Sequence, residues 1–220
     1  MEKIIIFGTG KTAELAHYYF TNDSQYEVVA FTVNAKYIDS EFFCDLPIYE
    51  FESIETKFLI EDVKIFVALA HSKMNKLREN IIKEAKKKGY KLASYISSRA
   101  TVFENVKLGE HCFILEDNTI QPFVEIGHNN ILWSGNHIGH HSKIGNNNFI
   151  TSHVVVSGNT IIGNNCFIGV NSTLRDEIII ADQTLIGAGC FISRNTEEKG
   201  VYKAKYAEKS NLYSDQIRGM

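Results

Sequence analysis

The sequence lacks three features that would each point to a class of protein. It has no excess of positive charge, since the net charge is −3, and this argues against nucleic-acid binding. It has no apolar run as long as a membrane span, and the amino terminus carries no charged segment followed by an apolar one. We therefore expect a cytoplasmic protein that binds neither nucleic acid nor membranes.

Cysteine is also scarce, with four residues in the whole chain. Cys112, Cys166 and Cys190 fall at the same position of a six-residue repeat. A shared position of this kind indicates small buried side chains rather than a disulfide framework or a metal centre, and it agrees with a reducing compartment.

The repeat itself is the strongest pattern in the chain. A branched aliphatic residue recurs at every sixth position, a period that fits neither an amphipathic helix nor a simple strand. It is typical of a parallel β-helix, whose stacked coils bury one continuous aliphatic column. The aliphatic positions are Val102, Leu108, Ile114, Ile120, Ile126, Leu132, Ile138, Ile144, Ile150, Val156, Ile162, Ile168, Leu174, Ile180, Ile186 and Ile192.

The residues between the aliphatic positions support this interpretation. Glycine often follows the aliphatic residue, as at Gly109 and Gly127, and we expect it to supply unusual backbone angles. Small or polar residues stand four positions after the aliphatic one, where they can tuck into corners. Asparagine runs at 146–148 and 164–165 suit turns.

The first 98 residues follow a different pattern, in which apolar strands alternate with helices. This alternation predicts a small parallel α/β sheet. The strands are expected at 3–7, 28–33, 63–70 and 92–96. One helical stretch is expected after residues 8–13 and through Phe20, and a second helix over 74–85, with Gly89 as a C-terminal cap. The predicted organisation is an α/β domain over 1–98, a β-helix over 99–195 and a tail over 196–220.

A glycine loop, residues 8–13, follows the first expected strand. A P-loop would need glycine at position 5, where Ile5 stands. The loop fits a dinucleotide fingerprint better, although the second βαβ half is missing and Asn34 stands near the place of the acid that would hold a ribose. Either the N–H groups at the helix start receive a phosphate or nucleotide, or the loop is only a tight turn.

Six of the eight histidines lie within the repeats, and none occupies the aliphatic column. His137, His140 and His141 are the densest group, and a rigid scaffold positions a general base well. A zinc site of the gamma-class carbonic anhydrase type needs two histidines five residues apart, and no pair in the repeats has that spacing. We therefore expect no metal.

Both parts of the chain together resemble the bacterial nucleotide-sugar N-acetyltransferases and the related sialic acid O-acetyltransferases. The resemblance runs from residues 4–7 and the glycine loop, through 138–141, to 162–171. It implies a left-handed coil, which the period alone does not determine, and a homotrimer with active sites between neighbouring prisms. A Gly-x-Pro-Ala-Lys segment common in relatives is absent, and residues 202–206 stand in that region, which suggests a branch nearer the GDP-perosamine N-acetyltransferases.

The resemblance also assigns catalytic roles. The general base falls on His140, and a backbone amide that stabilises the oxyanion falls on Gly158. The next residue after the base, acidic in some members, is His141 here, which implies a supporting role. His137 and His153 have no assigned role.

Two binding surfaces follow from the same resemblance. Acetyl-CoA is expected to contact Phe149, which replaces a family histidine, together with Gly158, Val170 and Ala188. The nucleotide is expected on the α/β domain, where the planar fork of an arginine would suit a diphosphate if it is not simply a solvated surface charge. The expected nucleotide-binding residues are Gly8, Thr9, Gly10, Lys11, Asn34, Ala70 and Arg78.

The implied activity is an acetyl-CoA-dependent N-acetyltransferase acting on the amino group of a nucleotide-linked amino sugar, in lipopolysaccharide or capsule biosynthesis. Transfer would be direct, with a histidine as general base. The first alternative is a sugar O-acetyltransferase of the sialic acid type. A metal-dependent β-helix enzyme or a non-catalytic scaffold is the second. The nucleotide, the sugar, the position of the amine and the acyl-chain length are not determined by the sequence.

Overall fold

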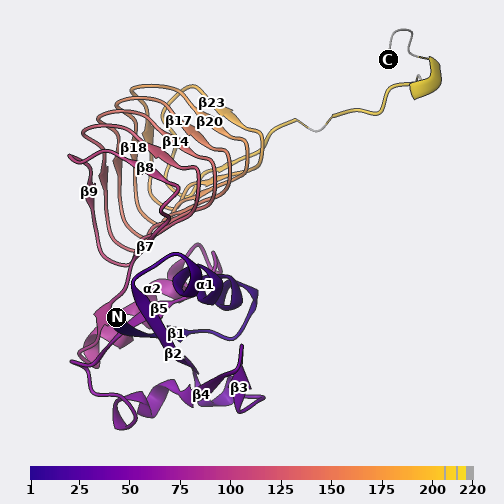
Figure 1. The fold of residues 1–220 in the computed structure, drawn as a ribbon. Helices are drawn as coiled ribbons and strands as arrows, with labels where there is room; N and C mark the ends of the chain where they lie inside the picture. The colour runs from indigo at the N-terminus through magenta and orange to yellow at the C-terminus, as the bar shows by residue number, and fades with distance from the viewer. Residues whose placement is uncertain (206, 212, 217–220) are drawn as a thin grey trace.

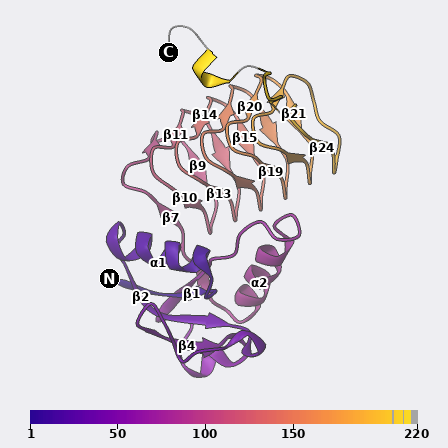
Figure 2. The same ribbon diagram turned by 90° about the vertical axis from the view of Figure 1, so that its right-hand side faces the viewer.

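The computed structural model describes residues 1–205, 207–211 and 213–216 as an α/β domain packed against a triangular prism (Figure 1). The coils of the prism stack beside one another, with β7 (Tyr95–Ile96) at the end nearest the α/β domain (Figure 2). After Ala204, which still packs against the prism core, the described chain extends away from the prism and carries one short 3-10 helix, η3 (Ser214–Gln216).

The α/β domain contains one sheet in the order β3-β4-β2-β1-β5-β6. Its parallel centre alternates side chains between two faces, so that Ile4 and Ile6 pack with helix α1 while Ile5 and Phe7 pack with helix α2. The elements are β1 (Glu2–Phe7), α1 (Lys11–Asn22), β2 (Tyr26–Val33), η1 (Ala35–Tyr37), β3 (Phe42–Phe43), β4 (Leu46–Glu50), η2 (Phe51–Thr56), β5 (Val63–Val67), α2 (Lys76–Lys87) and β6 (Lys91–Leu92).

The small parallel sheet predicted from the sequence is confirmed, with two differences. The strand expected at 92–96 is two strands, because Lys91 and Leu92 pair with β5 whereas Tyr95 and Ile96 pair with β10 of the prism. The antiparallel β3–β4 hairpin was not predicted, because the two residues of β3 are too few to show a period.

The prism has three faces, each a parallel sheet of two-residue strands. The first face is β7, β10 (Phe113–Ile114), β13 (Ile131–Leu132), β16 (Phe149–Ile150), β19 (Phe167–Ile168), β22 (Leu185–Ile186) and β24 (Val201–Tyr202). The second is β8 (Thr101–Val102), β11 (Thr119–Ile120), β14 (His137–Ile138), β17 (Val155–Val156), β20 (Thr173–Leu174) and β23 (Phe191–Ile192). The third is β9 (Lys107–Leu108), β12 (Glu125–Ile126), β15 (Lys143–Ile144), β18 (Ile161–Ile162) and β21 (Ile179–Ile180).

The aliphatic column predicted from the period is confirmed, since its residues form one buried cluster from Ile114 to Ile192, with Val102 and Leu108 packed against its end. By strand pairing the prism runs from Tyr95 to Tyr202, beyond the predicted limits of 99 and 195 on both sides.

The prism has three edges, and each takes its name from one residue. The Trp133 edge joins the first and second faces, the His140 edge joins the second and third, and the Asn129 edge joins the third and first.

The glycines that follow the aliphatic residues do not supply the unusual backbone angles expected of them. Gly109 and Gly127 do not have positive φ angles, which fall instead on residues two positions later, such as His111 and Asn129. A Cβ atom on Gly109 would lie 2.5 Å from the carbonyl carbon of Gly127 in the next coil. The glycines therefore permit close stacking of coils rather than unusual backbone angles.

The two domains share one hydrophobic cluster. Phe113, Ile131 and Phe149 on the first face pack with Phe20 and Phe66 of the α/β domain. These five side chains are at most 4% exposed, so the first face is covered along this part of its length. The relation between the domains is thus fixed by apolar burial.

A buried polar network adjoins this cluster and contains Arg78, which is completely buried. Its Nε donates to Oδ1 of Asn129 at 2.7 Å, and its Nη1 donates to the carbonyl of Ala70 at 2.9 Å. Nη2 donates to the carbonyls of Asn129 and Asn148 at 3.3 and 3.2 Å. Desolvation lowers the pKa of this guanidinium to about 9. The nucleotide-binding role expected for Arg78 is therefore wrong for this structure, because protein oxygens already occupy the fork.

His111 extends the network from the Asn129 edge. Its Nε2 accepts the N–H of Val67 at 2.8 Å, and its Nδ1 lies 3.0 Å from Oδ1 of Asn129. Burial and the nearby Arg78 lower the pKa of His111 to about 3, so the ring is neutral with its proton on Nδ1. A prism histidine thereby caps the end of β5.

We expect Arg78→Met to lower the free energy of unfolding by at least about 2 kcal/mol, because it leaves several buried oxygens without a donor. Arg99→Met is the matched control, since Arg99 forms an exposed ion pair with Asp117 whose side chains are 69% and 58% exposed. The control should change stability by less than about 1 kcal/mol. Urea unfolding measures both, and equal stabilities for the two variants would contradict a locking role for Arg78.

Candidate functional site

His140 lies on the edge opposite the face that the α/β domain covers. Its N–H donates to Oε1 of Gln121 at 2.9 Å, in the preceding coil. Its carbonyl accepts the N–H of Asn159 at 2.9 Å, in the following coil. The backbone is therefore held from both sides, while the side chain remains exposed.

His141 stands beside it in a left-handed backbone conformation, with φ at 59°. Its ring stacks on Phe123, with centroids 4.6 Å apart and planes at 28°. Its Nδ1 lies 3.2 Å from Nδ1 of His140, and the two ring planes are nearly perpendicular at 85°. The two imidazoles thus form a hydrogen-bonded pair.

Gly158 lies against the ring of His140. A Cβ atom on Gly158 would come within 2.8 Å of Cε1 and 2.9 Å of Nε2, so any larger residue would displace the imidazole. Its N–H has no hydrogen-bond partner among the described residues. At the same repeat position on the Asn129 edge, by contrast, the N–H of Asn146 donates to Oδ1 of Asn164 at 2.8 Å. A free backbone donor and an imidazole nitrogen therefore lie side by side on the His140 edge.

The glycine loop lies at the carboxyl edge of the parallel sheet. Gly8 donates its N–H to the carbonyl of Thr32 at 2.9 Å and has φ at 123°, which favours glycine. Gly10 is the N-cap of α1, and a Cβ there would meet nothing within 4 Å. The N–H groups of residues 9–12 have no partner within the described ranges. This combination of free donors and a helix start suits an anion.

The structure brings an acid to the end of β2, where the sequence has only Asn34. Oε1 of Glu52 accepts Nδ2 of Asn34 at 3.0 Å, and Oε2 accepts the N–H of Ala35 at 3.0 Å. Although partial burial opposes ionisation, these hydrogen bonds give Glu52 a lowered pKa. Sequence reasoning missed Glu52 because η2 carries it in from 18 residues away. The Phe51 ring, packed against Phe7 at 4.9 Å, ties η2 to the strand that precedes the glycine loop.

Apart from Gly158, the expected acetyl-CoA contacts are not on the His140 edge. Val170 and Ala188 lie on the Trp133 edge, where Val170 is 40% exposed. Phe149 is only 4% exposed, because it lies on the first face between Phe167 and His71. The structure of one chain therefore does not support direct contact of Phe149 with a coenzyme, since the α/β domain covers it.

The remaining histidines are not part of the His140 pair. His137 lies on the second face, and the ring of His153 lies over Gly135 on the Trp133 edge. Ala70 follows β5 near the glycine loop and packs against the shared hydrophobic cluster, and its carbonyl is engaged by Arg78. A single chain thus brings together His140, His141 and Gly158, and separately the glycine loop, Asn34 and Glu52.

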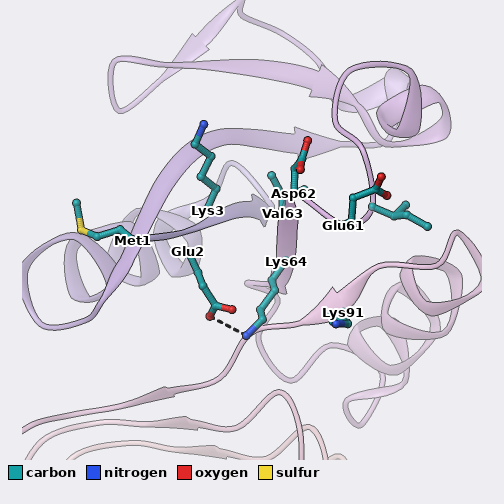
Figure 3. A pocket seen from close by; sticks show the side chains of 9 residues that line it. Met1, Glu2, Lys3, Glu61, Asp62, Val63, Lys64 and Lys91 are labelled. Atoms are coloured by element: carbon teal, nitrogen blue, oxygen red, sulfur yellow. Dashed lines mark hydrogen bonds and ion pairs between the residues drawn. The ribbon is translucent and has the colours of Figure 1, made fainter.

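A hollow of about 430 Å³ lies at the amino ends of β1 and β5. Figure 3 shows its charged lining, including Lys3, Asp62 and Lys91, and the ion pair between Lys64 and Glu2 at 2.8 Å. Because the glycine loop follows the carboxyl end of β1, the hollow is at the opposite edge of the sheet. We place neither candidate surface there.

Across the described ranges, no helix has the length and apolar character needed to cross a membrane. Within the same residues, no group of three or more histidine, cysteine, aspartate or glutamate side chains is arranged as metal ligands.

Residues 159–194 match the family bacterial transferase hexapeptide (six repeats). A comparison with curated proteins finds no match.

Solved structures show the same fold over nearly the whole chain. The acetyltransferase domain of PglB from Neisseria gonorrhoeae has a TM-score of 0.81 at 19% identity, covering 91% of this chain and 96% of that one. It has also been solved in complex with acetyl coenzyme A. WeeI from Acinetobacter baumannii has a TM-score of 0.77 at 16% identity, with coverages of 90% and 94%.

PerB from Caulobacter crescentus, solved in complex with CoA and GDP-perosamine, has a TM-score of 0.67 at 19% identity, with 91% of both chains covered. These TM-scores show a shared fold, and at identities this low the likeness extends to the fold alone. The chain thus carries transferase-type hexapeptide repeats on the fold of these proteins, a small α/β domain followed by a left-handed parallel β-helix.

Proposed function

We propose that the protein is an acetyl-CoA-dependent N-acetyltransferase acting on the amino group of a nucleotide-linked amino sugar. The observation that carries the proposal is the His140 imidazole lying against Gly158, whose N–H is free within the described part of the chain. The proteins of the same fold that were solved with acetyl coenzyme A, or with CoA and GDP-perosamine, support this choice of substrates.

The proposed reaction needs no acyl-enzyme, because a thioester is already activated. The amine nitrogen forms a C–N bond to the carbonyl carbon, and Nε2 of His140 takes the proton that the nitrogen loses. The Gly158 N–H stabilises the negative charge on the carbonyl oxygen, a contribution of about 3 kcal/mol in comparable sites. The C–S bond then breaks, and His140 returns the proton to the sulfur of CoA. His140 is the catalytic residue in this proposal.

A panel assay tests the activity. Thiol release from acetyl-CoA should occur with at least one of the UDP-, dTDP- or GDP-linked amino sugars and should depend on the free amine. Release with CMP-sialic acid or free sialic acid instead would favour the O-acetyltransferase alternative. Absence of release with every acceptor would contradict both proposals. No metal is required in the proposed reaction, and acetyl-CoA is the co-substrate.

The proposed assembly is a homotrimer, because the parts of the site lie on different surfaces of one chain. The His140 edge is separated by the second face from Val170 and Ala188, and the glycine loop lies beside the first face. Neighbouring prisms would bring these surfaces together. The exposed Val155, Ile161 and Ile179, 38–47% accessible, add apolar area for such contacts.

Light scattering should give the mass of three chains at micromolar concentration. A stable monomer that retains full activity would contradict the trimer and the shared site together.

The same proposal places the protein in the cytoplasm and in the biosynthesis of a lipopolysaccharide or capsule sugar. The four cysteines are free in the structure, in agreement with a reducing compartment. A free amine in the surface glycan of a strain lacking this protein would support the pathway, and an unchanged glycan would contradict it.

The nucleotide is proposed to place its phosphates on the free N–H groups of the glycine loop and its ribose against Glu52. In α/β sheets of this kind, an acid after the second strand accepts the ribose hydroxyl. Each carboxylate oxygen of Glu52 holds one donor already and retains capacity for another.

We expect Glu52→Gln to raise KM for the nucleotide sugar about tenfold or more, because a hydrogen bond to a charged acceptor is weakened. KM for acetyl-CoA should stay unchanged. Glu55→Gln is the matched control, since Glu55 is on the same η2 but pairs with Lys88 at 2.7 Å. Steady-state kinetics with each substrate varied in turn measures both. Equal effects of the two substitutions would argue against Glu52 as a ligand-binding residue.

His140→Asn should lower kcat by at least about a hundredfold, since removal of a positioned general base costs about 10²–10⁴ in rate. Folding and acetyl-CoA binding should remain nearly intact, because the side chain is exposed. His128→Asn is the matched control. His128 has the same repeat position on the Asn129 edge, where Asn146 and Asn164 follow in the next coils. Nearly full activity in His140→Asn would show that another residue is the base.

A further inference from the structure

We propose that His141 is the hydrogen-bond acceptor that keeps a proton on Nδ1 of His140 and thereby leaves Nε2 of His140 free to act as the base. The inference rests on the proposed function and deepens it, by assigning the tautomer of the reacting imidazole. His141 is a positioning residue in this role, because it acts through His140.

The distance between the two rings allows only two arrangements. Nδ1 of His140 and Nδ1 of His141 are 3.2 Å apart, so one of them carries the hydrogen and the other accepts it. If His141 were the donor, neutral His140 would carry its proton on Nε2 and could not accept another there. If His140 is the donor, its Nε2 has a lone pair. Only the second arrangement is compatible with a base beside Gly158, where Nε2 lies.

His141 is held in place independently of His140. Its N–H donates to the carbonyl of Pro122 at 3.3 Å, and its ring stacks on Phe123. Among the described residues, no carboxylate forms a hydrogen bond or ion pair with either imidazole, so each Nδ1 has the other ring as its partner. As an acceptor at Nδ1, neutral His141 carries its own proton on Nε2.

The pair returns to its starting state in each turnover. The N–H bond of the attacking amine breaks and an Nε2–H bond forms on His140, which becomes an imidazolium. Its Nδ1–H then donates to His141 as a charge-assisted hydrogen bond, which is stronger than the neutral one. The Nε2–H bond breaks as the S–H bond of CoA forms. His141 gains and loses no proton.

Three substitutions separate an acceptor role from a packing role. His141→Phe keeps a ring to stack on Phe123 but has no acceptor, whereas His141→Asp keeps an acceptor but has no ring. Phe123 occupies the equivalent position in the preceding coil with φ at 66°, and Asp117 has φ at 59° on another edge, so both residue types are compatible with this backbone conformation. His141→Asn supplies a weaker, neutral acceptor.

We expect His141→Phe to lower kcat about thirtyfold or more and His141→Asn about tenfold, within the range typical of residues that orient an active group. His141→Asp should keep kcat within about threefold of the unsubstituted protein. KM for acetyl-CoA should change less than about twofold in all three, and melting temperatures identify any variant that does not fold. Retained kcat in His141→Phe would overturn the inference in favour of packing against Phe123.

Loss of kcat in a folded His141→Asp, equal to that in His141→Phe, would overturn it as well. Failure of the proposed function looks different. If His140→Asn were fully active, the base itself would be misassigned, whereas an inactive His140→Asn with an active His141→Phe rejects only the role of His141.

Discussion

Each coil of the prism must deliver its main-chain N–H groups to carbonyl oxygens of the neighbouring coil, and this constraint governs the rest of the β-helix. Parallel pairs such as Phe113 with Ile131 and Phe149 with Phe167 keep successive coils in register. Once the register is set, the aliphatic column is buried and the corner residues form stacks along three edges. The backbone of a residue on an edge is therefore fixed by the coils on both sides of it.

That rigidity explains how an exposed histidine can have a defined position. His140 is held through its backbone by Gln121 and Asn159, and its ring rests on a glycine that no larger residue could replace without moving it. An exposed histidine on the edge lowers the stability of the fold little, because polar corner residues contribute little to the hydrophobic core. A residue on an edge can thus change without loss of the scaffold.

The contact between the domains depends on a different kind of interaction. Apolar packing of Phe20 and Phe66 on the first face supplies the area, while Arg78 and His111 satisfy buried main-chain groups that would otherwise lack partners. Because these polar groups have fixed geometry, they restrict the domains to one relative orientation. The glycine loop then has a defined place beside the first face, well away from the His140 edge of the same chain.

The sequence alone determined the prism, because a period of six residues fits neither an amphipathic helix nor a simple strand. It also determined the parallel centre of the α/β sheet, because buried strands and helices alternate in the first 98 residues. It also singled out His140 and Gly158 through the resemblance, and the structure brings those two residues together. Only the tertiary structure decided what depends on contacts between distant segments. The guanidinium of Arg78 has the donors that a phosphate ligand needs, but it is surrounded by oxygens from both domains. Glu52 reaches Asn34 because a separate 3-10 helix carries it there. Phe149 is covered by the α/β domain. Periodicity reports which side of an element is buried, but it carries no information on which other element lies against that side.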